Sequence, residues 1–396
     1  MRFRRALAVA GATWLALTSA HAEGPSERSG LVVDATTEIA GYADTDHVSV
    51  FTPSVGAQVR DPLAGWSARG NYLVDIVSAA SVDIVSSASS RWTEVRHAGG
   101  LSATYKPDTF GVTASGSISR EPDYLSLSGG GSLSLELFDK SVTPSLGYTF
   151  THDTAGRTGT PFSVYSLELN RHTITGTTAI VVNRDTALNV GGDVIVEVGH
   201  QEKPYRYLPV FAPDVAPRVP THASVEAVNG LRLPGRVAER LPTTRQRYAM
   251  SLRLAQRLSD STFVISERLY TDSWGLRATT TDLRLVFDLS RRVYLWPHLR
   301  AHFQNGVSFW KLAYSADVSA GSVPNVPLYR TGDRELSPLS TGTLGGGLHW
   351  NLGSSAAPSR FSLQFLAEGA VTAFHDALYI DQRLSGLLST QLEIEL

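Results

Sequence analysis

Six of the ten arginines in one stretch of the sequence, residues 243–303, fall on the inward-facing positions of the extended runs predicted there. They are Arg245, Arg247, Arg253, Arg257, Arg284 and Arg300. The first four alternate with the apolar residues Tyr248, Met250, Leu252 and Leu254. Alternation of this kind has the period of a β-strand with two unlike faces. Neighbouring guanidinium groups on one face create a positive field, which favours anions.

Acids and histidines occupy the same polar faces. Asp282 and Asp288 alternate with leucines, and His298 and His302 flank Arg300. By parity we expect the following acids to join the arginines: Asp193, Glu197, Asp282, Asp288 and Glu368. The charges therefore have two interpretations, which are selection of solutes in a pore or a network of ion pairs that neutralise one another.

The histidines do not form a metal or hydrolase motif. His298 and His302 are four apart, so they lie roughly 13 Å apart at about 3.3 Å per residue, too far for one metal ion. Serine and histidine are abundant, yet no spacing singles out a nucleophile and its base. We expect no enzyme and no cofactor, and keep an outer-membrane hydrolase as an alternative.

Two further segments could act at the entrance to a pore. Asp75 and Asp83 lie in a tandem octapeptide, VDIVSAAS followed by VDIVSSAS, whose oxygens could surround a hard cation or bond to backbone amides and arginines. Seven prolines in residues 201–242 exclude regular structure from most of that segment. Its polar and aromatic residues Tyr205, Arg206 and Tyr207 suggest a loop that folds into the lumen as a constriction or, alternatively, binds a partner.

The sequence predicts that these residues lie on long β-strands. The runs in residues 243–303 last roughly 11 to 16 residues, whereas strands of globular proteins average about 5–6. Tilted strands of about 9–11 residues or more are what a bilayer requires. The chain offers about sixteen such strands: 31–42, 48–60, 65–76, 93–106, 110–120, 124–138, 142–152, 172–182, 186–200, four within 243–303, 336–352, 360–374 and 382–396. We predict an all-β fold, a transmembrane antiparallel β-barrel.

The links between strands alternate in length. Every second link is short and polar, and the long ones, at 77–92, 153–171, 201–242 and 305–335, all fall on the other side. Short periplasmic turns and long extracellular loops are typical of outer-membrane barrels. Aromatic residues near strand ends, including Phe287 beside a turn and Tyr270 and Trp274 beside a loop, are typical of interfacial girdles.

The N-terminus and the composition indicate an exported protein. Residues 1–22 have the arginine-rich start, apolar stretch and Ala20-His21-Ala22 ending of a secretory signal peptide, which leaves residues 23–396 for the barrel. There is no cysteine, and the net charge of −2 argues against a nucleic-acid partner. The expected location is the outer membrane of a Gram-negative bacterium.

Several of these segments together resemble a known family. The octapeptide repeat, residues 204–209 (PYRYLP), residues 268–274 (RLYTDSW) and residues 329–337 (YRTGDRELS) are similar to the uncharacterised outer-membrane family known as domain of unknown function 3570, over nearly the whole chain after the leader. The resemblance implies an outer-membrane barrel and supplies no substrate.

The resulting hypothesis is a porin-like channel or transporter for a small polar solute. The arginines are compatible with an anionic solute. The expected partners are membrane lipid and that solute. The alternatives are a non-conducting barrel that anchors or scaffolds a periplasmic or surface protein, and a barrel hydrolase.

Overall fold

The computed structural model describes residues 30–79, 92–317, 325–352 and 360–396. By its contacts the chain divides into Met1–Gly30 and Leu31–Leu396, and all described residues except Gly30 belong to the second unit. The expected signal peptide and Asp83 lie outside the described residues.

Sixteen long strands form the wall. Each has 12 to 15 residues. They are β1 (Val32–Asp44), β2 (Val48–Asp61), β3 (Trp66–Ala79), β4 (Trp92–Tyr105), β5 (Phe110–Glu121), β6 (Tyr124–Leu135), β7 (Val142–Ala155), β8 (Leu167–Val181), β9 (Thr186–Gly199), β13 (Thr244–Arg257), β14 (Ser261–Asp272), β15 (Arg277–Asp288), β16 (Val293–Gln304), β18 (Leu339–Asn351), β19 (Arg360–Phe374) and β20 (Gln382–Glu395).

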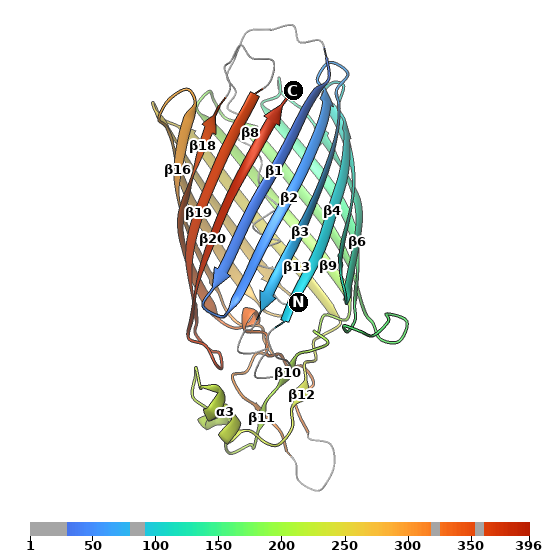
Figure 1. The fold of residues 1–396 in the computed structure, drawn as a ribbon, viewed down its shortest axis with the longest axis vertical. Coiled ribbons are helices and arrows are strands. Elements are labelled where there is room, and N and C mark those ends of the chain that lie inside the picture. Colours follow the sequence, from blue (N-terminus) through green and yellow to red (C-terminus); the bar gives the residue numbers. More distant parts are fainter. Residues whose placement is uncertain (1–29, 80–91, 318–324, 353–359) are drawn as a thin grey trace. The chain divides into compact units, whose positions relative to one another are not determined.

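These strands close into one antiparallel barrel (Figure 1). Each strand pairs with the next along the chain, and β1 pairs with β20, where Glu38 lies opposite Gln391. Closure leaves no unpaired strand edge, the condition that a bilayer imposes on a sheet. The predicted transmembrane barrel of about sixteen strands is confirmed. None of the described helices has the length and apolar character needed to cross a membrane.

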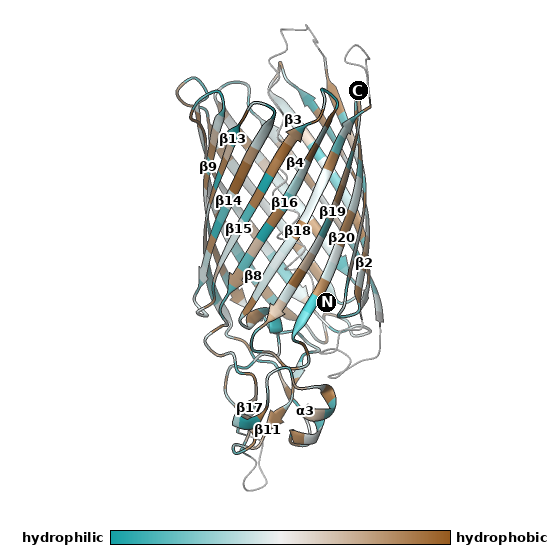
Figure 2. Cartoon of the chain, turned by 90° about the vertical axis from the view of Figure 1, so that its left-hand side faces the viewer, coloured by the Kyte–Doolittle hydropathy of each residue, from teal (hydrophilic) through white to brown (hydrophobic). Residues whose placement is uncertain are grey.

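The two faces of each strand differ as the sequence predicts. On β13, Tyr248, Met250 and Leu252 are exposed large apolar residues, while the intervening Ala249 and Ser251 are partly buried. In a transmembrane barrel, an exposed apolar side chain on a wall strand faces lipid. The residues between such side chains therefore face the lumen. Figure 2 shows apolar and polar residues alternating along the strands.

The links separate into two kinds. At one end, here called the turn end, links such as 62–65, 106–109 and 258–260 are short. At the other, the loop end, the expected loop at 77–92 lies mostly outside the described residues, and the described links include 156–166, 200–243 and the described parts of 305–338.

The last two of these loops build a folded lobe beyond the strand ends (Figure 1). Strand β10 (Tyr207–Leu208) pairs with β12 (Val237–Ala238), and β11 (Val210–Phe211) pairs in parallel with β17 (Tyr314–Ser315). The lobe also holds η1 (Ala216–Arg218), α3 (Val225–Leu231) and η2 (Arg334–Leu336). The proline-rich loop therefore extends outward from the mouth, which corrects the expectation that it folds between the barrel walls.

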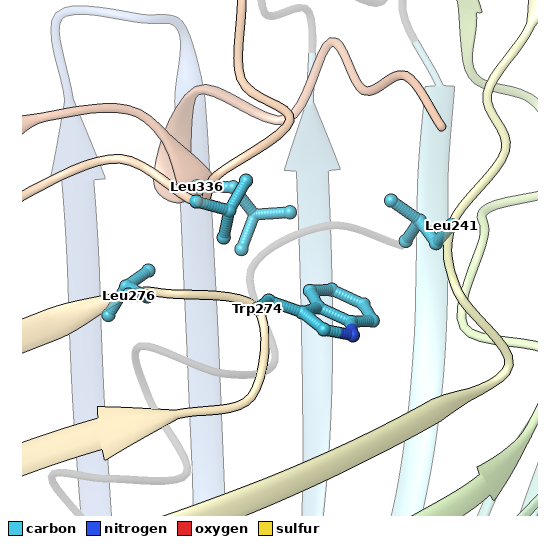
Figure 3. Packing of buried hydrophobic residues seen from close by; sticks show 5 residues of the cluster. Leu241, Trp274, Leu276 and Leu336 are labelled. Carbon is cyan, nitrogen blue, oxygen red and sulfur yellow. The ribbon is translucent and has the colours of Figure 1, made fainter. Parts of the chain in front are cut away.

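Buried apolar clusters join the lobe to the barrel. One consists of Leu241, Trp274, Leu276, Val307 and Leu336 (Figure 3). Trp274 is only 4% exposed, and the Tyr270 hydroxyl accepts a hydrogen bond from the lumen residue Arg247 at 2.9 Å. The expectation that Tyr270 and Trp274 belong to an outer aromatic girdle is therefore wrong, because both turn toward the mouth.

Candidate functional site: the lumen and its mouth

The arginines of β13 near the loop end are neutralised. Arg245 is 3% exposed, and its Nε donates to Asp272 at 2.8 Å. Arg247 lies 3.3 Å from Glu197, a fully buried carboxylate that Arg171 also approaches at 2.9 Å. Isolated buried charges are costly, so these pairs stabilise the wall by satisfying one another.

A second chain of contacts runs across β15, β16 and β19. The His298 ring lies 2.9 Å from Glu368 through Nδ1 and 2.7 Å from Asp282 through Nε2. Arg300 donates to the same Asp282 oxygen at 3.0 Å. With both carboxylates ionised, His298 donates from both nitrogens and is the imidazolium.

His302 belongs to a different group. Its Nδ1 lies 2.8 Å from the Thr280 hydroxyl and its Nε2 lies 3.3 Å from Gln304. The two histidines thus have separate partners, in keeping with their wide spacing on the strand. Neither imidazole has the open coordination that a shared metal would need.

Nearer the turn end two more pairs line the wall. Arg257 lies 2.6 Å from Asp288, and Arg268 of β14 lies 2.9 Å from Asp193. All five acids expected from parity therefore contact basic side chains. Most of the lumen charge forms the neutralising network that the sequence left as one of two interpretations.

Arg253 differs from the paired arginines described above. Within the described parts of the chain, no carboxylate or other acceptor receives a hydrogen bond from its side chain. The charged groups that act on it are Arg284, which repels it, and Asp282, which is already bonded to His298 and Arg300. Two guanidinium groups thus share one region of the wall, flanked by the small β14 residues Val264 and Ser266.

Strands β5 to β8 give the lumen a second kind of wall, made of hydroxyls. By alternation with exposed residues such as Val112, Leu133 and Leu146, its inward side chains are mostly serine and threonine. They are Thr113, Ser115, Ser117, Ser119, Ser126, Ser128, Ser132, Ser134, Thr143, Ser145, Thr149, Thr151, Thr173, Thr175 and Thr177. Some bond across strands, as Ser117 does with Ser128 at 2.6 Å. Hydroxyls both donate and accept, which suits polar solutes and water.

Asp75, one of the expected mouth residues, is already satisfied. Its two oxygens accept from the Thr52 hydroxyl and from Nε of Arg96, each at 2.6 Å. An arginine and a hydroxyl as partners favour the expectation that Asp75 bonds to arginine over the expectation that it binds a cation. Asp83, the second acid of the repeat, lies outside the described residues.

The three residues expected to act in the proline-rich loop lie in different environments. The Tyr205 hydroxyl donates to Asp123 at 2.9 Å, and burial raises the pKa of Tyr205. Arg206 is 4% exposed and bonds to Glu239 at 3.2 Å and also to Asp333. Tyr207, in contrast, is exposed on β10.

The sequence did not indicate the anchors that tie the lobe to the barrel. Glu94, Glu121 and Asp123 bring one carboxylate oxygen each within 4.8 Å of one another beneath Tyr205. On another part of the rim, Asp46 forms a buried ion pair with Arg334 of η2. Parity would have placed Glu94 and Glu121 inward, but nothing local shows that Tyr205 reaches Asp123 beside them.

The hydrolase alternative has one contact to consider. Among the described residues a serine meets a histidine only at Ser340 and His375, which lie 3.0 Å apart at the loop end. No described side chain is bonded to the other nitrogen of His375, so the orienting group of a triad is missing from this part of the chain.

Comparison with solved structures finds other barrels at low similarity. The ferric enterobactin receptor PfeA of Pseudomonas aeruginosa aligns with a TM-score of 0.44 and 11% identity, over 90% of this chain and 59% of the receptor. OccK5 (OpdH) of the same species gives 0.42 and 8%, over 92% and 98% of the two chains. A bacterial polysaccharide outer membrane secretin gives 0.43 and 10%, over 91% and 97%. This chain therefore spans less than two thirds of the length of the receptor.

These likenesses carry no inference about what the barrel conducts or binds. No curated protein is a significant match to the sequence. The model of the family described as "Protein of unknown function (DUF3570)" matches residues 168–360, from β8 to the first residue of β19. That range holds the arginine strands and the lobe and omits Asp75, so it is narrower than the resemblance expected from the sequence. Over residues 168–360, the predicted resemblance of this chain to the DUF3570 family is confirmed.

Proposed function

We propose that the barrel is an outer-membrane channel for small polar solutes and that it favours anions. Arg253 carries the proposal, because no described acceptor bonds to its side chain and a second arginine, Arg284, acts on it electrostatically from the same region of the lumen wall. The paired arginines contribute little net field, since a carboxylate within about 4 Å cancels most of their charge at a distance. The hydroxyl wall offers a polar path on the other part of the lumen.

The test is ion selectivity in planar bilayers under a potassium chloride gradient. Refolded protein should show a reversal potential displaced from zero toward the equilibrium potential of chloride, which means that chloride permeates more readily than potassium. Arg253→Glu should move that potential toward potassium, because it replaces the unpaired positive charge with a negative one. Unchanged selectivity in this variant would contradict the proposal.

Gln246→Glu provides the matched control. Gln246 lies on β13 with the even-numbered, lipid-facing residues, so its new charge stands outside the lumen. It should leave the reversal potential where it is. An equal shift in both variants would mean that total charge, not the lumen position, sets the selectivity.

A second candidate is a non-conducting barrel that presents its lobe to a partner protein. Contacts of the loop 200–243 with distant parts of the rim favour it: the Tyr205 hydroxyl donates to Asp123, and His222 N donates to Ala377 O in the β19–β20 link. A loop held at both places crosses the entrance. Folded protein without any conductance, in the native form and after removal of the lobe, would support this candidate over a channel.

A further inference from the structure

The lobe carries a positively charged face that the lumen does not involve. Residues 237–240 alternate: Val237 packs in the apolar cluster around Leu208, Glu239 is 5% exposed, and Ala238 and Arg240 are exposed. Tyr207 lies opposite Ala238 and is also exposed. One face of this small sheet is therefore buried and the other presents an aromatic ring and a guanidinium group to water.

A second arginine joins this face through backbone pairing. Arg240 N donates to Arg330 O at 3.0 Å, and Arg330 N donates to Arg240 O at 2.9 Å. Residues that exchange both backbone bonds across an antiparallel bridge project their side chains to the same face, about 5 Å apart. Like charges placed opposite each other in this way are destabilising.

The two guanidinium groups are not neutralised locally. Nε and Nη1 of Arg330 donate to the carbonyls of Ala238, Pro327 and Leu328. These bonds orient the group without cancelling its charge. In the described residues, no carboxylate accepts from either arginine. Burial and the positive charge of Arg240 lower the pKa of Arg330.

We propose that Arg240 and Arg330, together with the Tyr207 ring, form a binding site on the lobe for an oxyanion such as a phosphate or carboxylate group. An oxyanion between the guanidinium groups would remove their repulsion and accept charge-assisted hydrogen bonds from both. Tyr207 offers an apolar surface beside it for the body of a ligand. Since the lobe extends beyond the strand ends, the ligand comes from the aqueous phase (Figure 1). The site is separate from Arg253 and does not depend on conduction.

The experiment is calorimetric titration of the refolded full chain with inorganic phosphate at constant ionic strength. Saturable binding is expected, with affinity lowered roughly tenfold or more in Arg240→Gln and in Arg330→Gln, because each loses charge-assisted hydrogen bonds. Arg240→Lys should bind more weakly than the native chain, since an ammonium group cannot donate as a fork. Non-saturable heats in the native chain would overturn the proposal.

Matched variants separate this site from general electrostatics and from the lumen. Arg218→Gln removes an exposed lobe arginine that already pairs with Asp214 at 2.8 Å, and Arg253→Gln removes the lumen cation on which the proposed anion preference rests. Both should bind phosphate as the native chain does. Equal losses in these variants would overturn the site. If Arg253→Glu leaves selectivity unchanged while Arg240→Gln still weakens phosphate binding as expected, the proposed function fails and this site stands.

A lipid arm tests the origin of the anion. Protein in phosphatidylcholine vesicles and in vesicles containing phosphatidic acid should bind phosphate equally, because headgroups at the barrel rim do not reach the lobe. Loss of binding only with phosphatidic acid would contradict the aqueous origin. The heat-dependent gel mobility of folded barrels confirms that every variant has folded.

Discussion

At the scale of single residues, the sequence predicts which face a side chain occupies but not its partner. Alternation alone places Arg245 and Arg253 on the inward face of β13. Whether each finds a carboxylate depends on the register with β14. This register puts Asp272, which bonds to Arg245, at the position opposite Arg247, and it puts Ser266 opposite Arg253. That register is set by links and by strands far apart in the sequence. The paired and unpaired arginines therefore look alike until the barrel is closed.

Trp296 shows the same limit in an apolar setting. It lies directly opposite Gly347 in the β16–β18 register and is 4% exposed. A Cβ atom added at Gly347 would overlap the indole ring and approach the carbonyl oxygen of Phe365 at 2.8 Å. Gly347, the last of three consecutive glycines, therefore provides room for the tryptophan, and nothing in the local sequence indicates this.

Gly347→Ala should therefore destabilise the barrel by about 1–3 kcal/mol, the usual effect of inserting a methyl group into a filled space. Urea unfolding of protein refolded into lipid vesicles, followed by tryptophan fluorescence, measures it. Gly342→Ala on the same strand is the control, because no atom lies within 4 Å of the added Cβ. If the two variants have equal stability, the tryptophan does not depend on Gly347 for its space.

At the scale of elements, strands and lobe differ in how far they can be predicted. Long alternating runs bounded by short polar links identify the wall strands, because a bilayer imposes both their length and their two faces. The lobe strands have two residues each. Such short pieces have no readable period, and β11 pairs with β17 from a different loop. Proline content correctly excludes long elements there but does not predict where the loop goes.

The lobe instead depends on a buried polar centre. Arg206 bonds to Glu239 and Asp333, and Glu239 also accepts from the Thr331 hydroxyl, so the two long loops are joined by one arginine. The nearby Tyr314 hydroxyl accepts from Thr331 N, and burial raises the pKa of Tyr314 to about 12. A buried polar network of this kind loses much of its stability when one of its members is removed, because the remaining polar groups stay buried without a partner.

Arg206→Leu should open the lobe and leave the barrel closed. Removing one member of a buried ion pair costs about 3–5 kcal/mol, because the remaining carboxylates stay buried without their cation. Hydrogen–deuterium exchange should rise at β10, β12 and β17 and stay unchanged in β1 to β9. Arg218→Leu is the control, since its exposed pair contributes at most about 1 kcal/mol. Exchange in Arg206→Leu that matches the control would show that the centre does not hold the lobe.

At the scale of the whole barrel unit, the lobe connects distant parts of the rim. Tyr205 of the loop 200–243 bonds to Asp123 in the β5–β6 link. Two other residues of the loop, His222 and Ala223, form backbone hydrogen bonds with the β19–β20 link: His222 N donates to Ala377 O, and Ala223 O accepts from Tyr379 N. The same loop leaves the wall at β9 and returns at β13. Its contacts thus lie on three separated arcs of the sixteen-strand ring. A segment anchored in this way crosses the opening, so in the proposed channel it would stand in the path of an entering solute.

Removal of residues 202–240 should therefore raise single-channel conductance. A short glycine–serine link can replace them, because β9 and β13 are adjacent antiparallel strands with Val198 opposite Thr244. The anion preference should persist in the shortened chain, since Arg253 remains in the wall. The measurement is single-channel recording of native and shortened protein in the same bilayers. Removal of residues 157–165 at the rim, which shortens a loop without crossing the mouth, is the control and should change conductance less. Equal conductance in the native and shortened chains would mean that the lobe leaves the entrance open and serves only the outer surface.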